Sequence, residues 1–196
     1  TIKSIINNVS ETLRGTTLSE NGVSVNTVEH LLSALFGLEI DNALIEIDGP
    51  EVPILDGSAG QIVDAIEKAG IFEQSDLKVY FEIKQPIIYT IPEKGIEYIA
   101  IPDNDYNVTV LIDYNSNVLV NQFASLENIE NYKNEIATAR TFVFLHELEI
   151  LASKGLIKGG SLDNALIIID KDLPLPPDVS LCRGSNSSNL LIFFIN

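Results

Sequence analysis

The sequence predicts an α+β protein of two tandem domains with similar topology, each a small sheet with helices packed on one face. The first observation is a repeat: the segment 41–48 recurs as 163–170 with seven of eight positions identical, and each copy follows an apolar helical stretch and a glycine. The second is helical spacing of apolar residues ahead of each copy. The third is a central run of short apolar segments separated by turn residues, which is typical of an antiparallel sheet. A favoured strand sequence arising twice by chance is the other explanation of the repeat.

The first predicted helix begins after Thr27, a good N-cap residue, and ends at Gly37, a typical C′ glycine. Its glutamate at position 29 lies in the first turn, where the helix dipole favours a negative charge. One buried stripe at helical spacing is expected from Val28, Leu31, Leu32 and Leu35.

A strand over 43–47 and a turn-rich loop over 48–57 are expected next. Ser58 and Gln61 have the spacing of a capping box, which predicts a second helix ending near Gly70. Four further strands are expected, at 79–84, 87–91, 96–101 and 108–113. A helix is expected over 142–154, with an apolar stripe from Phe144, Leu148 and Leu151, and it should end at Gly155. A bend at Gly159–Gly160 then leads into a last strand at 165–169.

The composition shift near residues 74–77 predicts a domain boundary, so that 1–75 forms an incomplete first α+β domain and 76–170 an incomplete second one. The segment 171–196 is atypical, because it is rich in proline, then in serine and asparagine, and ends in an apolar run. The chain has no methionine, so Thr1 is expected to be an internal position of a longer protein. The tail is expected to reflect truncation or a reading-frame artefact.

The chain of 196 residues has 12 basic and 28 acidic side chains, a formal charge of −16. Such a charge disfavours binding to nucleic acids and anionic membrane surfaces. One cysteine cannot form an internal disulfide, which fits a reducing compartment. No apolar run reaches the length of a spanning helix. We therefore expect a cytoplasmic monomer with no stable membrane insertion and no nucleic-acid partner.

Few residues can carry chemistry, because the chain has two histidines and one cysteine. His146 and Glu147 begin like the zinc motif H-E-x-x-H, but position 150 is isoleucine, so the motif fails and His146 is interpreted as a helix-surface residue. Glu29 and His30 lie together at a helix start, where a metal ligand and a general base can share a place. From the residues alone, a solvated surface pair is the favoured explanation.

Three segments shift the interpretation towards the catalytic pair: 27–32 (TVEHLL), 37–42 (GLEIDN) and 50–58 (PEVPILDGS). They resemble the zinc-dependent UDP-3-O-acyl-N-acetylglucosamine deacetylases of lipid A synthesis. The segments 139–142 (ARTF) and 159–165 (GGSLDNA) are similar to that family too, and 125–170 looks most like its Bacteroidetes members. The resemblance covers roughly residues 10–170 with several long motifs in the same order.

This resemblance implies hydrolysis of the N-acetyl group of a UDP-linked acyl amino sugar, releasing acetate. It implies a Zn²⁺ cofactor with His30 as one ligand and Glu29 as the base that takes a proton from water. Thr141 matches the hydroxyl that stabilises the oxyanion. Zinc lowers the pKa of its water to near 7, and one good oxyanion donor is worth ~3 kcal/mol, so these roles are chemically reasonable.

The same resemblance implies substrate contacts. Asp113 and Tyr114 match an Asp-Phe pair that contacts uridine, although the polar end of a strand explains them equally well. Phe142 and Phe144 flank Thr141 and either shape the site or fill the core. An apolar passage for the acyl chain is implied for Leu145, Leu148, Ile157, Gly160, Ser161 and Ile167, for which plain core packing is the other explanation.

The sequence also departs from the family. No block of the type H-K-x-x-D-x-x-G-D follows residue 170, so one recognisable zinc ligand is present where a catalytic zinc normally has three. The chain is therefore expected to be incomplete, to bind zinc weakly and to turn over poorly or not at all alone. The alternative is a non-catalytic, degenerate nucleotide-sugar-binding or interaction module. A purely structural α+β domain is disfavoured by the specific motifs. Acyl-chain length and fusion to a second enzyme stay open.

Overall fold

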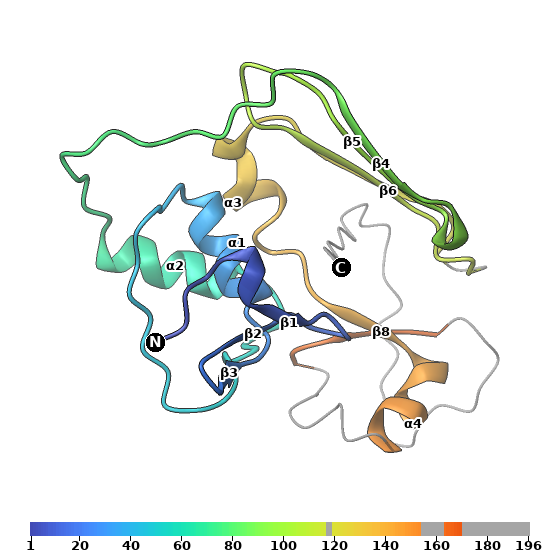
Figure 1. Ribbon diagram of the computed structural model, residues 1–196. Coiled ribbons are helices and arrows are strands. Elements are labelled where there is room, and N and C mark those ends of the chain that lie inside the picture. Colours follow the sequence, from blue (N-terminus) through green and yellow to red (C-terminus); the bar gives the residue numbers. More distant parts are fainter. Residues whose placement is uncertain (117–118, 154–162, 170–196) are drawn as a thin grey trace.

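The computed structural model describes residues 1–116, 119–153 and 163–169 and has the predicted α+β character (Figure 1). Helices α1 (Glu29–Gly37) and α2 (Gly60–Ala69) pack on each other in the N-terminal part. Two β-hairpins extend away from these helices, and the C-terminal elements lie below the hairpins in the view of Figure 1.

The chain begins with a three-stranded antiparallel sheet that the sequence analysis did not anticipate. It contains β1 (Val9–Glu11), β2 (Thr17–Glu20) and β3 (Val23–Val25), with β2 in the centre, after the short helix η1 (Ile6–Asn8). Asn21 and Gly22 join β2 to β3 with φ values of 53° and 79°, which suits the tight turn of a hairpin. Leu18 of β2 packs with Val28 and Val52 in a small apolar cluster.

Helix α1 lies where the apolar spacing predicts it, but its cap differs. The N-cap position is Val28, not Thr27, and no side chain caps the helix. Thr27 instead has a left-handed φ of 58°, and its hydroxyl donates to Glu51 Oε1 at 2.7 Å. The predicted cap is therefore wrong by one residue, because the Thr27 hydroxyl is used to hold the loop over 48–57.

Helix α2 confirms the second predicted helix, whereas the capping box is wrong. The N-cap position is Ala59, and no side chain caps it. Ser58 is buried, and its hydroxyl accepts a hydrogen bond of 3.1 Å from the Gly60 N–H while donating to Asp56 Oδ1 at 2.8 Å. Ser58 therefore joins the start of α2 to the preceding loop.

The main core brings together segments from either side of the predicted boundary near residue 75. Its buried members are Ala34, Ala59, Val63, Leu126, Tyr132, Ile136 and Ala137. Tyr132 begins α3 (Tyr132–Glu135), which follows η3 (Ile129–Asn131), and its ring passes so close to Gly37 that a Cβ there would lie 2.0 Å from Cδ1. The division into domains 1–75 and 76–170 stays a prediction.

The predicted antiparallel strands form two hairpins. The first joins β4 (Ile87–Ile91) to β5 (Ile96–Ala100) through η2 (Pro92–Lys94), in a register from Ile87↔Ala100 to Ile91↔Ile96. The second pairs β6 (Val108–Ile112) with β7 (Gln122–Leu126), a strand that was not predicted. The strand expected at 79–84 is wrong, because this segment pairs with no other described segment and Val79 is 93% exposed.

The two copies of the repeat have different conformations. In the second copy, β9 (Leu166–Ile168) pairs in parallel with β8 (Phe142–Phe144), while the strand expected at 43–47 is absent from the first copy. Helix α4 runs over Leu145–Ser153, so Phe144 belongs to a strand and not to the helix predicted from residue 142. Pairing with the second copy holds 142–144 extended.

Several expectations lie outside the described residues, namely those on Gly155, on the Gly159–Gly160 bend and on the tail. No helix in the described part of the chain combines the length and the apolar composition that crossing a membrane requires.

Candidate active site

The N-terminal side of the candidate site is the first turn of α1. Glu29 and His30 are its first two residues, and both are half-buried. The Thr16 N–H donates to Glu29 Oε2 at 2.9 Å, and the Val28 N–H donates to the Thr16 carbonyl at 3.2 Å. The backbone between β1 and β2 thus fixes the carboxylate through one of its oxygens.

His30 has the protonation state that metal binding requires. Burial lowers the pKa of its imidazole, and the nearby carboxylates of Glu29 and Asp56 raise it by less than burial lowers it. The ring is therefore neutral near pH 7, which is the form that coordinates a metal ion. Asp56 lies close enough to affect His30 although 26 positions separate them in the sequence.

The loop over 48–57 is held along the start of α1. The Asn26 N–H donates to the Pro50 carbonyl at 2.9 Å, and the Val52 N–H donates to the Asn26 carbonyl at 3.1 Å. These bonds and the Thr27–Glu51 bond align the loop in parallel with the chain that enters α1. This alignment carries Asp56 towards His30.

The same loop contacts the C-terminal side of the site. The Thr141 N–H donates to the Gly57 carbonyl at 2.7 Å, and the Thr141 carbonyl accepts from the Leu166 N–H at 3.0 Å. Thr141 is half-buried and immediately precedes β8. Residues 56 and 57 therefore link His30 to Thr141, so the structure brings the predicted ligand and the predicted oxyanion donor to one loop.

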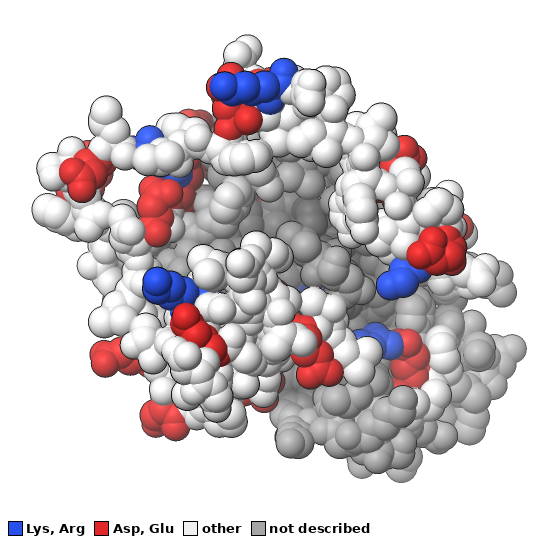
Figure 2. All heavy atoms as spheres, viewed as in Figure 1, with Lys and Arg blue, Asp and Glu red and all other residues white. Residues whose placement is uncertain are grey.

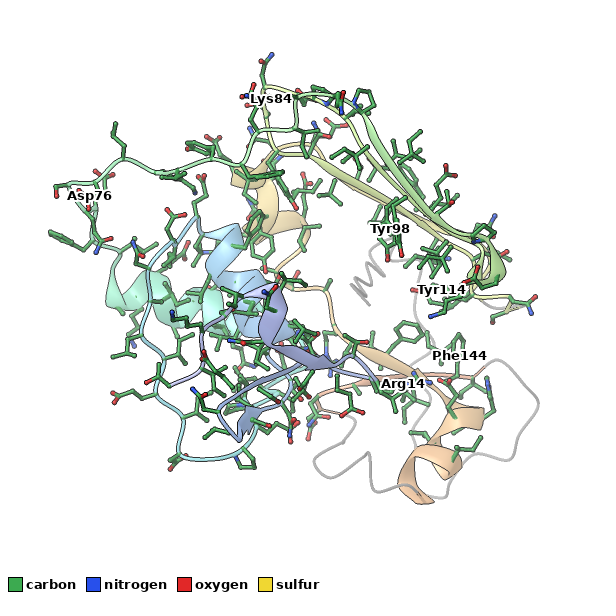
Figure 3. The ribbon with its side chains drawn as sticks, in the orientation of Figure 1. Arg14, Asp76, Lys84, Tyr98, Tyr114 and Phe144 are labelled. Atoms are coloured by element: carbon green, nitrogen blue, oxygen red, sulfur yellow. The ribbon has the colours of Figure 1, made fainter. Side chains whose placement is uncertain are left out.

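The predicted substrate aromatics form a cluster beside Thr141. Tyr114 makes edge contacts with Phe142 and Phe144, at ring-centroid distances of 5.4 and 6.2 Å, and Phe144 stacks on His146 at 5.5 Å. Figure 3 shows Tyr114 at the end of the hairpin arm, facing Phe144. The Tyr114 hydroxyl is buried without a hydrogen-bond partner among the described residues, and burial raises its pKa.

The other predicted residues divide into three groups. Asp113 is exposed, and its Oδ1 accepts from the Asn115 N–H at 2.8 Å. Leu145 is buried and Leu148 half-buried on α4, and Ile167 is half-buried opposite Val143 in the β8–β9 pair. The remaining candidates, Ile157, Gly160 and Ser161, lie outside the described residues.

Some contacts of the site were not recognised from the sequence. Arg140 donates to the carbonyls of Asp56 and Asp163, and Arg14 pairs with Glu147 across the gap between the β1–β2 turn and α4. Figure 3 shows Arg14 close to β8. Arg140 and Asp56 stand inside the ARTF and PEVPILDGS segments, and those motifs were the available signal.

Among the described residues, neither a patch of like charge (Figure 2) nor the hollow found on the surface marks the candidate site. Acidic side chains are scattered over the face seen in Figure 2 and do not gather in one patch. A shallow hollow is lined by Glu46, Ile47, Asp48 and Pro53, none of which is a candidate site residue.

The donor side chains of the described residues fall short of a complete metal site. The described residues contain no group of three or more His, Cys, Asp or Glu side chains that could hold a metal ion. His30 fits as a single neutral ligand, but a catalytic zinc normally takes three protein ligands. The described residues alone thus do not make up a zinc site.

Comparison with known proteins gives consistent matches. A family model described as LpxC, UDP-3-O-acyl N-acetylglycosamine deacetylase, matches residues 1–179. A bifunctional enzyme LpxC/FabZ of Bacteroides thetaiotaomicron is 50% identical over 173 residues, which are 88% of this chain and 38% of that protein. A UDP-3-O-acyl-N-acetylglucosamine deacetylase of Saccharophagus degradans is 46% identical over 167 residues, 84% of this chain and 54% of that protein. The chain thus spans about half or less of the length of these two curated relatives.

Proposed function

This chain belongs to the UDP-3-O-acyl N-acetylglycosamine deacetylase family, and we propose that it carries part of the site that hydrolyses the N-acetyl group of UDP-3-O-acyl-N-acetylglucosamine in lipid A biosynthesis. The products are acetate and the free amine of the sugar. The observation that carries this proposal is the loop at residues 56–57, where Asp56 lies near His30 and the Gly57 carbonyl accepts from the Thr141 N–H.

Glu29 is proposed as the general base. The Thr16 N–H donates to Oε2, and the carboxylate is proposed to accept the proton of the attacking water. This hydrogen bond from a backbone amide orients the carboxylate. Positioned general bases contribute about 10²–10⁴-fold to the rate, so removal of this carboxylate is expected to have a large effect.

Thr141 is proposed as a donor to the oxyanion that forms when water attacks the acetyl carbonyl. Its backbone is held on both sides, because its N–H donates to Gly57 and its carbonyl accepts from Leu166. A hydroxyl on a fixed backbone requires little rearrangement in the transition state, and one such donor is worth about 10²–10³-fold in rate.

His30 is proposed as one ligand of Zn²⁺, the metal that the family resemblance implies. A bound zinc ion supplies a water of lowered pKa and polarises a carbonyl. The chemistry that this chain derives from its own residues is the proton transfer to Glu29 and the hydrogen bond from Thr141.

The substrate contacts are proposed on the same basis. Tyr114, with Asp113 beside it, offers an aromatic face for the uridine, and its buried hydroxyl is available for a hydrogen bond. The acyl chain is proposed to lie against Leu145, Leu148 and Ile167, which come from α4 and β9 near the aromatic cluster.

The test measures acetate release from UDP-3-O-acyl-N-acetylglucosamine, with Zn²⁺ present, by a full-length family protein that contains this chain and by its Glu29→Gln variant. The variant is expected to lose about 10²–10⁴-fold in kcat with its fold intact by circular dichroism. The matched control is Glu39→Gln, the same change at an exposed position just after α1, and it is expected to keep its rate within about twofold.

Equal rates for the wild type and Glu29→Gln would remove Glu29 as the base. Binding of the UDP-sugar with no acetate release from the zinc-loaded full-length wild type would favour the other candidate, a non-catalytic nucleotide-sugar-binding module.

A further inference from the structure

Arg140 connects two segments that lie far from each other in the sequence. Its Nε donates to the Asp56 carbonyl at 2.7 Å, and its Nη2 donates to the Asp163 carbonyl at 2.5 Å. Both acceptors are backbone oxygens, and 84 positions separate Arg140 from Asp56. The planar guanidinium holds its donors in a fixed geometry, so it sets the distance between the two segments that it joins.

The same two segments touch each other next to Arg140. Gly57 has a left-handed φ of 83°, and a Cβ at this position would lie 2.0 Å from the Asn164 carbonyl oxygen and 3.2 Å from Thr141 Cγ2. No side chain fits there. The loop at 56–58, the Arg140–Thr141 dipeptide and the turn at 163–164 are therefore packed backbone to backbone, with Thr141 among them.

We propose that Arg140 is a positioning residue, which places the Thr141 hydroxyl by fixing the loop at 56–58 to the turn at 163–164. The inference rests on the proposed function of Thr141. Arg140 touches backbone carbonyls and acts through the Thr141 backbone, whose N–H donates to Gly57. A lysine carries its three donors on one nitrogen and lacks the planar fork that sets the spacing between the two carbonyls.

The arrangement explains why an arginine precedes the threonine. The Thr141 N–H donates to the Gly57 carbonyl, and the Thr141 carbonyl accepts from the Leu166 N–H. Gly57 follows Asp56, and Leu166 lies three residues after Asp163, so each partner is close to a carbonyl that Arg140 binds. If the loop moves away, the Thr141 N–H loses its acceptor and the hydroxyl loses its orientation. A displacement of about 1 Å at a catalytic group can cost about 100-fold in rate.

The first measurement is amide hydrogen exchange on the purified 196-residue chain. Arg140→Ala and Arg140→Lys are expected to raise the exchange rates of the Thr141 and Leu166 amides about tenfold or more, while the amides of α2 stay unchanged. The control, Lys133→Ala, removes an exposed cation that pairs with Asp64 and Glu67 and is expected to change neither amide. Unchanged exchange at Thr141 in both Arg140 variants overturns the proposal.

The second measurement separates positioning from general stability through the acetate-release assay. Arg140→Ala is expected to lower kcat about 10–100-fold with KM within about threefold. If Arg140 acts through the Thr141 hydroxyl, Thr141→Val should lower kcat much less in the Arg140→Ala background than it does in the wild type. Fully additive losses overturn the proposal.

One further variant and one added ion keep the test decisive if Arg140→Ala is destabilised. Gly57→Ala leaves Arg140 intact but places a Cβ against Asn164, so it should reproduce the exchange and kcat effects. Added guanidinium ion should restore part of the protection of the Thr141 amide against exchange in Arg140→Ala. If Gly57→Ala leaves exchange and kcat unchanged and guanidinium restores no protection, the proposal is overturned. A full-length wild type that binds Zn²⁺ but releases no acetate refutes the proposed function, whereas the exchange result on the 196-residue chain then still decides whether Arg140 orders Thr141.

Discussion

The two copies of the eight-residue repeat have nearly the same sequence and different structures. In the second copy, β9 pairs with β8, the Leu166 N–H donates to Thr141, and the described residues from position 164 are half-buried. The first copy has no ladder, and Leu44 is 82% exposed. Its polar ends make single contacts, from Asn42 to Gln74 and from Asp41 to Lys78.

This difference teaches that the repeat encodes a preference for extended backbone and not a strand. A strand forms only where another backbone offers donors and acceptors and where its side chains become buried. Residues 142–144 provide both for the second copy. As a consequence, the second copy pairs with the Thr141 side of the candidate site, whereas the first copy leads into the loop over 48–57 without forming a strand.

The largest expected effect comes from removing the aromatic ring of Phe142, the residue that pairs with Leu166 of the second copy. Phe142 is buried and pairs with Leu166, so Phe142→Ala is expected to cost about 3–5 kcal/mol in the free energy of unfolding, as measured by urea denaturation. Leu44→Ala in the first copy is the control, with an expected change of about 0.5 kcal/mol or less because its side chain is exposed. Similar losses for both would contradict the comparison.

A second test exchanges the one position at which the copies differ. Ile168→Glu places a carboxylate in the half-buried strand opposite Phe144 and is expected to cost about 1–3 kcal/mol. Glu46→Ile makes the first copy match the second, yet it should leave residues 43–47 without a strand partner. Amide exchange over both copies measures this, and new protection at 43–47 would show that sequence alone can decide the strand.

A third test measures how firmly α1, the helix that precedes the first copy, is held by Tyr132. Tyr132 anchors α1 through a 2.6 Å hydrogen bond with Ser33, and Tyr132→Phe is expected to cost about 1 kcal/mol. Burial raises the pKa of Tyr132, and the Ser33 bond opposes this by a smaller amount. A raised folded pKa means that the contribution is complete below the unfolded value of about 10 and is lost as pH rises through the folded value.

Urea unfolding at a series of pH values checks the sign of this effect. The stability difference between the wild type and Tyr132→Phe should be constant from pH 7 to about 9 and should shrink above about 10. A difference that grows with alkaline pH would show that the buried phenol is not the group that titrates.

The smallest expected effect concerns the ion pairs of the first copy. Lys78 Nζ lies 3.4 Å from Glu39 Oε1 and 3.6 Å from Asp41 Oδ1, and all three side chains are substantially exposed. Exposed pairs of this kind contribute little, so Lys78→Ala should change the free energy of unfolding by about 0.5 kcal/mol or less, and less still in high salt. A loss above about 2 kcal/mol would show that the first copy is anchored more firmly than its exposure indicates.

The sequence predicted much of the fold where the signal is local. The spacing of Val28, Leu31 and Leu32 located α1, and the turn residues before Gly95 located the first hairpin. The strand β7 was missed, because its sequence, QFASL, shows no clear alternation of apolar and polar residues. The helix start at residue 142 was wrong, because an aromatic strand and a helical stripe look alike over three residues.

The candidate site was predicted only in part, for a related reason. The motifs contained Glu29, His30 and Thr141, and the structure links the last two through the loop at 56–57. The role of Arg140 and the close approach at Gly57 depend on segments more than 80 positions apart, and no local pattern reports such a contact.

By itself, the amino-acid order determined the amphipathic helices, the turns of the first hairpin and the family motifs, because each depends on residues within a few positions of one another. Only the tertiary structure decided which copy of the repeat became a strand and where the Thr141 backbone is held. Those outcomes depend on hydrogen-bond partners and burial supplied by distant segments, and the same local preference leads to opposite results when the neighbours differ.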